Sequence, residues 1–252
     1  MQRLRAVIIL GIACLAAVDV SHSEDDRGAS VVRQMHDKYD GAWFATTRFE
    51  QKTTTYDADG KPTVESWHER IQLPGKLRID VGPAQDGNAM ILVDGQLHTF
   101  KAGNSVDSRP LISLALLLGF DVYQQSPDVT VAQLQHEGVD TGKVHEDSWQ
   151  GRPAFVVGAD NGNLTATQFW IDKERLLVVR IIQPSRKDPA VSSDIRFLDF
   201  RNQGRGVIAA RIDVYQKDRL VMSEEYSAIE TDIPLDQGWF DPSKLVTPTS
   251  AH

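Results

Sequence analysis

The chain has 252 residues, of which 41% are hydrophobic and 25% are charged, proportions typical of a soluble globular protein. Its formal net charge is −8 and it contains no basic run, which argues against a nucleic acid or an anionic lipid surface as partner. The length allows one large β domain or two smaller ones.

Residues 1–23 have the pattern of a secretory signal peptide. A short positive region precedes an apolar run from Ala6 to Val18, which is too short to span a bilayer comfortably. Small residues before the expected cleavage point predict that the mature chain begins after Ser23. We therefore expect a periplasmic protein with a single domain over residues 24–252, and a retained anchor helix is the alternative.

Cys14 is the only cysteine and lies inside the apolar run. The segment around it resembles a lipoprotein box, so acylation at Cys14 is a second alternative. It is less favoured, because Gly11 stands where such a box has Leu and the apolar run continues past the cysteine. Removal of the segment would leave a mature chain without cysteine or disulfides.

The first half of the chain predicts one helix and then a β meander. Apolar residues at helical spacing indicate an amphipathic helix over about 28–40. Residues 43–100 then contain a long hairpin that turns at Asp57–Gly60, a turn at Pro74-Gly75 and a tight hairpin at Asp94-Gly95. The meander has one apolar face, as expected for the wall of a container.

The second half begins with an apolar segment, LISLALLLGF, that starts at Leu111. It is hydrophobic on all sides and predicts a buried helix over 111–118, either inside the curve of a sheet or between two layers. Pro127 then opens a short helix through Gln135. Seven strand patterns separated by short turns follow and must be antiparallel, at 144–149, 152–159, 166–172, 176–183, 192–201, 207–216 and 219–229. We expect a mainly β (α+β) fold: a single highly curved antiparallel sheet, an unclosed half-barrel of about 11 strands with helices on its concave side.

No pattern indicates catalysis, a metal or a cofactor. The histidines are scattered and show no His-x-x-x-His spacing. The segment Asp57–Gly60 resembles the start of a calcium loop, but His68 stands where such a loop needs Glu. The carboxylates do not pair persuasively, since the neighbours Glu224 and Glu225 point to opposite faces of a strand. We expect a protein that is not an enzyme.

Aromatic and aliphatic residues gather in the strand patterns. A strongly curved sheet with few helices cannot pack its whole concave face, so the remainder would form an apolar cavity suited to acyl chains. The simpler interpretation places the same residues in the core. The candidate lining consists of Trp43, Phe49, Trp67, Ile71, Leu73, Leu77, Ile79, Met90, Leu92 and Phe100 from the meander, and Leu114, Leu117 and Leu118 from the apolar helix.

The order of elements resembles the superfamily of LolA-like proteins, which includes the periplasmic outer-membrane lipoprotein carrier. The resemblance rests on Phe49–Lys52, the Leu73–Arg78 turn, the Val93–Phe100 hairpin and the closing segment Ile229–Pro242. It implies an unclosed barrel with helices in its mouth, an apolar cavity for acyl chains and no enzymatic activity. The carriers usually have an Arg immediately before the turn proline, where it holds a helical lid closed, and this chain has Leu73 there.

The first of three functional hypotheses is a carrier of lipid or lipoprotein acyl chains. The second is an envelope sensor or protein-interaction module on the same scaffold, with an inner- or outer-membrane protein as partner. The third, less favoured, is a hydrolase of envelope lipids, which would need a catalytic cluster that the sequence does not contain. We expect a monomer.

Overall fold

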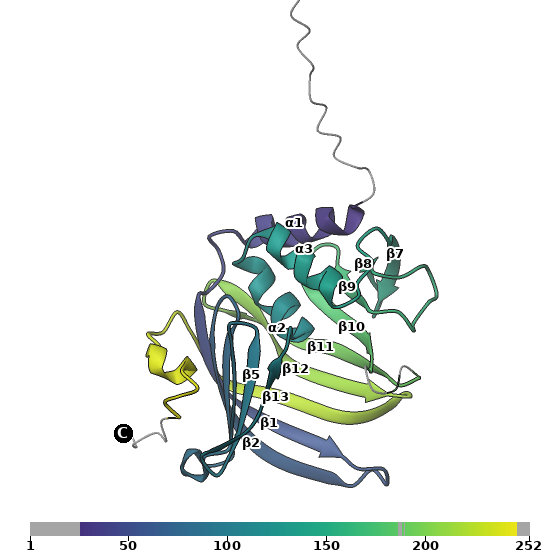
Figure 1. Ribbon diagram of the computed structural model, residues 1–252. Helices are drawn as coiled ribbons and strands as arrows, with labels where there is room; N and C mark the ends of the chain where they lie inside the picture. The colour runs from purple at the N-terminus through teal and green to yellow at the C-terminus, as the bar shows by residue number, and fades with distance from the viewer. Residues whose placement is uncertain (1–25, 186–187, 189, 246–252) are drawn as a thin grey trace, which may run out of the picture.

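The computed structural model describes residues 26–185, 188 and 190–245. Its strands form a 13-stranded sheet in the order β6-β5-β4-β3-β2-β1-β13-β12-β11-β10-β9-β8-β7, and every neighbouring pair is antiparallel. The sheet curves strongly but does not close, because β6 and β7 are its two free edges (Figure 1). The predicted half-barrel is confirmed. The predicted signal peptide and Cys14 lie outside the described residues.

The strands fall into two meanders in which neighbours in sequence are neighbours in the sheet. The first contains β1 (Thr46–Tyr56), β2 (Pro62–Gln72), β3 (Lys76–Val81), β4 (Ala89–Val93), β5 (Gln96–Lys101) and β6 (Asn104–Pro110). The second contains β7 (Val144–Trp149), β8 (Arg152–Val157), β9 (Gln168–Asp172), β10 (Val178–Pro184), β11 (Ser192–Gln203), β12 (Gly206–Gln216) and β13 (Arg219–Thr231). Pairing of β1 with β13 joins the two meanders and makes β13 the central strand.

Turn chemistry explains the predicted hairpins. Asp94 and Gly95 have φ values of 49° and 71°, the left-handed conformation that both central residues of a type I′ turn adopt. Val93 therefore pairs with Gln96 and sets the register of β4 against β5. The strand β6 was not predicted, since all of its side chains are exposed and it shows no apolar alternation.

Helix α1 (Arg27–Tyr39) begins where the side chain of Asp26 accepts a hydrogen bond of 2.9 Å from the N–H of Ala29. Helix α3 (Pro127–His136) matches the predicted short helix, and the two helices pack together over one end of the sheet (Figure 1). Three short 3₁₀ turns complete the elements, namely η1 (Ala84–Asp86), η2 (Asp121–Tyr123) and η3 (Gln237–Phe240).

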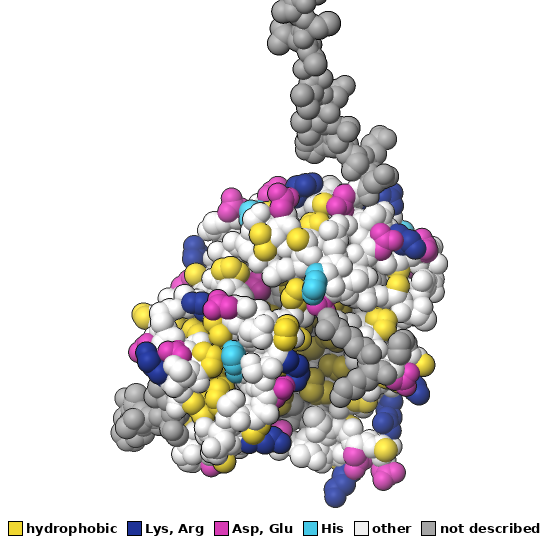
Figure 2. Space-filling model, viewed as in Figure 1, with side chains coloured by type: hydrophobic (Ala, Val, Ile, Leu, Met, Phe, Trp, Pro, Cys, Tyr) yellow, Lys and Arg dark blue, Asp and Glu magenta, His cyan; other side chains and the backbone are white. Residues whose placement is uncertain are grey.

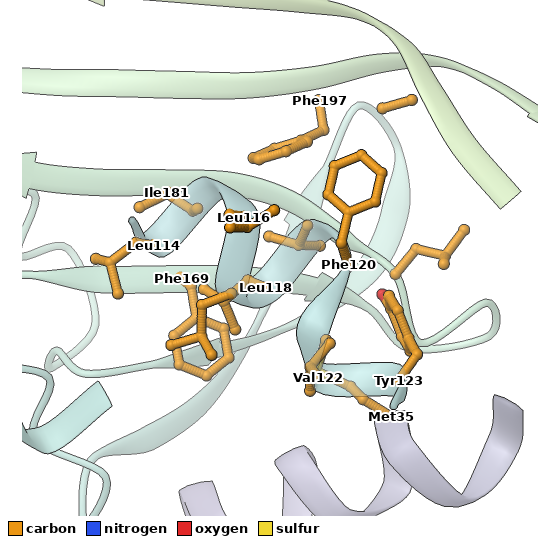
Figure 3. Packing of buried hydrophobic residues seen from close by; sticks show 14 of the residues in the cluster. Met35, Leu114, Leu116, Leu118, Phe120, Val122, Tyr123, Phe169, Ile181 and Phe197 are labelled. Carbon is orange, nitrogen blue, oxygen red and sulfur yellow. The ribbon is translucent and has the colours of Figure 1, made fainter. Parts of the chain in front are cut away.

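Helix α2 (Leu114–Gly119) lies inside the curve of the sheet, as the apolar segment predicts. It is shorter than predicted, because Ser113 caps its start and Leu111 and Ile112 are not helical. Figure 3 shows its side chains packed against those of the sheet, and the whole cluster is buried. The members drawn from α2 and the sheet include Leu114, Leu116, Leu118, Phe169, Ile181 and Phe197.

Candidate binding groove

Register places the side chains of the first meander on the two faces of the sheet, since residues directly opposite in an antiparallel pair share a face. Ile71 of β2 lies opposite Leu77 of β3, and Leu77 lies opposite Leu92 of β4. These three residues belong to or pack against the core that surrounds α2, so their face is the concave one. Residues two and four positions away along each strand share that face.

Seven of the predicted lining residues are buried in the core around α2. Their side chains pack against one another and against the helix, so they are not free to contact a ligand in this conformation. They are Trp43, Phe49, Ile71, Leu92, Leu114, Leu117 and Leu118. Leu73 and Leu77 are partly buried against the same core. The simpler interpretation, that such residues are core, is correct for this group.

Trp43 was predicted to be part of the meander, but it precedes β1 and does not belong to a strand. Its ring packs at 5.0 Å from that of Tyr39 in α1 and at 4.0 Å from that of Tyr123 in η2, measured between centroids. This aromatic cluster packs α1 against η2.

Phe100 lies on the wrong face for the predicted lining. It pairs with Ala89, which is one residue away from the concave Met90 and therefore points to the convex side. There it packs with Ala89 and Ile91 in a separate buried cluster. Phe100 is thus excluded from the concave face.

Trp67, Ile79 and Met90 remain as predicted lining residues that are partly exposed on the concave face. Val81 of β3 and two residues missed by the sequence analysis, Val214 of β12 and Met222 of β13, are partly exposed on the same face. We call these six residues the open groove. Figure 2 shows a hollow in one face of the molecule with hydrophobic side chains in its wall.

A cleft of about 550 Å³ lies at the mouth of the half-barrel, between the segment that leads into α2 and strands β10 to β12. Its apolar wall includes Leu111, Ile112 and Ile195. Ile195 lies opposite Val214, and Val214 lies opposite Met222. The apolar surface of this cleft therefore continues along the concave face into the open groove.

Three carboxylates of β2 and β13 share the concave face with these apolar residues: Glu65, which lies opposite Thr53 of β1 and is exposed, and Glu69 and Glu224. Glu69 lies between Trp67 and Ile71 on β2, and Glu224 lies two residues from Met222 on β13. Glu69 is 7% exposed, and no hydrogen bond joins its carboxyl to another described residue. We call Glu69 and Glu224 the acidic pair. It lies where the open groove meets the packed core.

Burial and mutual repulsion disfavour the charged forms of the acidic pair. Burial raises the pKa of Glu69 well above its ordinary value, and the nearby charge of Glu224 raises it further. Burial raises the pKa of Glu224 to about 7, although hydrogen bonds from Tyr226 and Gln51 oppose this shift. The hydroxyl of Tyr226 donates to Glu224 Oε2 at 2.9 Å.

Two further polar atoms beside the acidic pair have no partner among the described residues. They are Oε1 of Gln51 and the indole Nε1 of Trp67, and both atoms are buried. Gln51 and Trp67 lie directly opposite each other on β1 and β2. An orphaned buried polar atom costs free energy comparable to that of a lost hydrogen bond, so these atoms mark a place where a ligand or ordered water can bind.

The acidic pair was not predicted, because its two carboxylates come from strands that are far apart in the chain. A signal was present, since Glu69 falls between the apolar residues Trp67 and Ile71 on one face of the strand. Within the described residues, no group of three or more His, Cys, Asp or Glu side chains is arranged to hold a metal ion. No helix in the same part of the chain has the length and hydropathy needed to cross a bilayer.

Several solved structures superpose on most of this chain. A DUF1329 family protein from Desulfovibrio piger superposes with a TM-score of 0.60 at 15% identity, over 89% of this chain and 100% of that one. A LolA superfamily protein from Nitrosomonas europaea gives a TM-score of 0.53 at 15% identity, over 83% and 97% of the two chains. This protein has a LolA-like fold.

A third structure agrees with that conclusion. It is a domain from Vibrio parahaemolyticus described as an outer membrane lipoprotein-sorting protein, with a TM-score of 0.56 at 12% identity over 88% of this chain and 99% of that one. No family model matches the sequence, and no curated protein matches it. The superpositions show a shared LolA-like fold, but at identities this low they do not show a shared function. The function must be argued from the geometry of this chain's own groove.

Proposed function

We propose that this protein is a non-enzymatic carrier that shelters acyl chains of lipids or lipoproteins in its open groove. The observation that supports this function is the run of partly exposed apolar side chains on the concave face, which continues from the 550 Å³ cleft to the acidic pair. Concavity, an apolar lining and few polar anchors are the features of a small-molecule site. Under this proposal the cargo-contacting residues are those of the open groove, with Leu73 and Leu77 at its border.

The LolA-like fold is the second support for a carrier, and the signal-peptide pattern of residues 1–23 supports a periplasmic location for it. The proposal includes cleavage after Ser23 and a soluble mature form. The intact mass of the exported protein tests this part. A mass that retains Cys14 with acyl groups would show that the protein is a lipoprotein instead.

A series of saturated acyl chains of increasing length tests the binding function. Each additional buried CH₂ contributes about 0.8 kcal/mol before ordering costs, so affinity should rise with chain length until the groove is full and then level off. Trp67 lies in the groove, so its emission should shift to the blue on binding, and the shift should be lost in Trp67→Phe. Weak binding that does not change with chain length would reject the carrier and favour a protein-interaction module on the same scaffold.

A further inference from the structure

We propose that the acidic pair receives the ammonium group of an aliphatic amine whose hydrocarbon chain lies along the open groove. This inference rests on the proposed function and specifies its ligand chemistry. It assigns a role to Glu69 and Glu224, which an apolar groove for neutral or anionic lipids would not need.

The acidic pair has no cation of its own. On β1 and β2 the described cationic side chains next to it point to the opposite face, because they alternate with the concave residues. Each of them is already engaged there: Lys52 with Glu225 at 3.0 Å, Arg48 with Glu230 at 2.8 Å and Arg70 with Asp80 at 2.7 Å. When the acidic pair is ionised, its negative charge is therefore not compensated by these neighbours.

Two unpartnered acceptors at the pair favour a ligand that donates hydrogen bonds, whereas the unpartnered Nε1–H of Trp67 is left for water or for an acceptor on the ligand. Glu69 has no hydrogen bond to a described residue, and Oε1 of Gln51 is a buried acceptor without a donor. An ammonium group carries three donors and a positive charge, and charge-assisted hydrogen bonds to carboxylates are among the stronger ones in proteins. Burial without a counter-charge is costly for both carboxylates, and a bound cation would reduce that cost.

The surroundings favour an alkylammonium over a metal ion. Hard metal ions such as Ca²⁺ need six or more oxygen ligands, and the described residues supply no cluster of three acidic or metal-ligating side chains here. The adjoining surface is instead apolar, from Met222 beside Glu224 and from Ile79 beside Glu69 across β2 and β3. This arrangement suits a molecule with a charged head and a hydrocarbon tail.

Three probes of equal chain length test the proposal: decylamine, decanol and decanoate, each titrated into the full-length mature protein by calorimetry near neutral pH. We expect decylamine to bind about tenfold more tightly than decanol, the equivalent of about 1.4 kcal/mol, and decanoate to bind more weakly than decanol. Glu69→Gln and Glu224→Gln should each bring decylamine close to decanol while the binding of decanol persists.

The matched control is Glu225→Gln, which removes the neighbouring carboxylate that faces solvent and pairs with Lys52. It should leave the preference for the amine unchanged. A thermal melt of each variant verifies that it is folded. Equal binding of decylamine and decanol to the parent protein would overturn the ammonium site while the carrier function stood. If none of the three probes bound, the carrier function itself would fall and the inference with it.

Discussion

Oδ1 of Asp121 accepts a hydrogen bond of 2.9 Å from the backbone N–H of Gly75. Asp121 begins η2 directly after α2, and Gly75 lies in the turn between β2 and β3, so this bond ties the helix inside the half-barrel to its wall. Leu73, two residues before Gly75, has an apolar side chain and cannot form such a polar link. A carboxylate from the helix side makes this connection in this chain.

Removing the acceptor at Asp121 should weaken this connection. We expect Asp121→Ala to lower the free energy of unfolding by about 1–3 kcal/mol, because the partly buried N–H of Gly75 loses its partner. Asp121→Asn keeps an acceptor oxygen without a charge and should retain most of the stability, since burial already raises the pKa of Asp121 to about 7. Urea denaturation measures both variants, and an Ala variant as stable as the parent would contradict this role.

A charge placed on α2 should destabilise the protein. Leu117 is 2% exposed in the core, so Leu117→Lys would leave an ammonium buried without a counter-charge, at a cost of several kcal/mol, on the order of that for breaking a buried ion pair. The control is Leu164→Lys, since Leu164 is 48% exposed and its replacement should change little. Thermal melts compare the two. Equal melting temperatures would mean that α2 does not plug the half-barrel.

Substitutions on the two faces of the first meander should have different effects on the affinity for an acyl chain. Met90 lies in the open groove, and Met90→Ser should lower affinity for a long acyl chain several-fold, because it removes apolar surface from the groove. Phe100→Leu changes the convex cluster and should leave affinity unchanged although it costs some stability. Calorimetric titration with one saturated chain distinguishes these outcomes. Loss of binding in the Phe100 variant alone would reverse our assignment of faces.

Stability should fall as pH rises from about 5 to about 8. The pKa of Glu224 is raised to about 7 in the folded state, so the protonated form stabilises the fold below the unfolded pKa of the group, and this contribution is lost as pH passes through the raised value. The shift corresponds to a loss on the order of 3 kcal/mol. Glu69, which is coupled to Glu224, and Asp121 are shifted in the same direction.

Thermal melts between about pH 5 and about pH 8 test whether stability falls as pH rises. Glu224→Gln should flatten the dependence, and Glu225→Gln should not, because Glu225 is exposed and paired with Lys52. Part of the pH dependence of stability should persist in Glu224→Gln, because the raised pKa of Asp121 also contributes to it. A parent protein that gained stability steadily up to about pH 8 would show that the acidic pair is charged and compensated in the folded state.

Much of the fold could be predicted from turn chemistry and alternation. The Asp94-Gly95 turn, the apolar segment before α2 and the short turns of the second half each specify a local structure, and these local structures add up to an antiparallel meander. Strand β6 could not be predicted in this way, because an exposed edge strand has no apolar face to reveal it. Its existence depends on hydrogen bonds to β5 rather than on side-chain burial.

The face of the sheet on which Phe100 lies could have been predicted correctly. A two-residue turn at Asp94-Gly95 pairs Val93 with Gln96, and counting outward places Phe100 opposite Ala89, on the other face from Met90. The acidic pair could not have been found by counting. Glu69 and Glu224 come onto neighbouring parts of one concave face only because β1 pairs with β13, a contact between the two ends of the sheet-forming sequence that no local pattern specifies.

The pairing of β1 with β13 also determines at what stage of chain synthesis the groove can form. A chain that emerges from its N-terminus can form each meander through local hairpins as soon as its residues are available, but the seam between the meanders must wait for Arg219–Thr231, the last strand to be made. Until then β1 presents an unpaired edge to its surroundings. Glu69 and Glu224 lie on opposite sides of this seam, so the concave face is incomplete until β13 has paired. Under the proposed carrier function, cargo would therefore be loaded only after the polypeptide is complete.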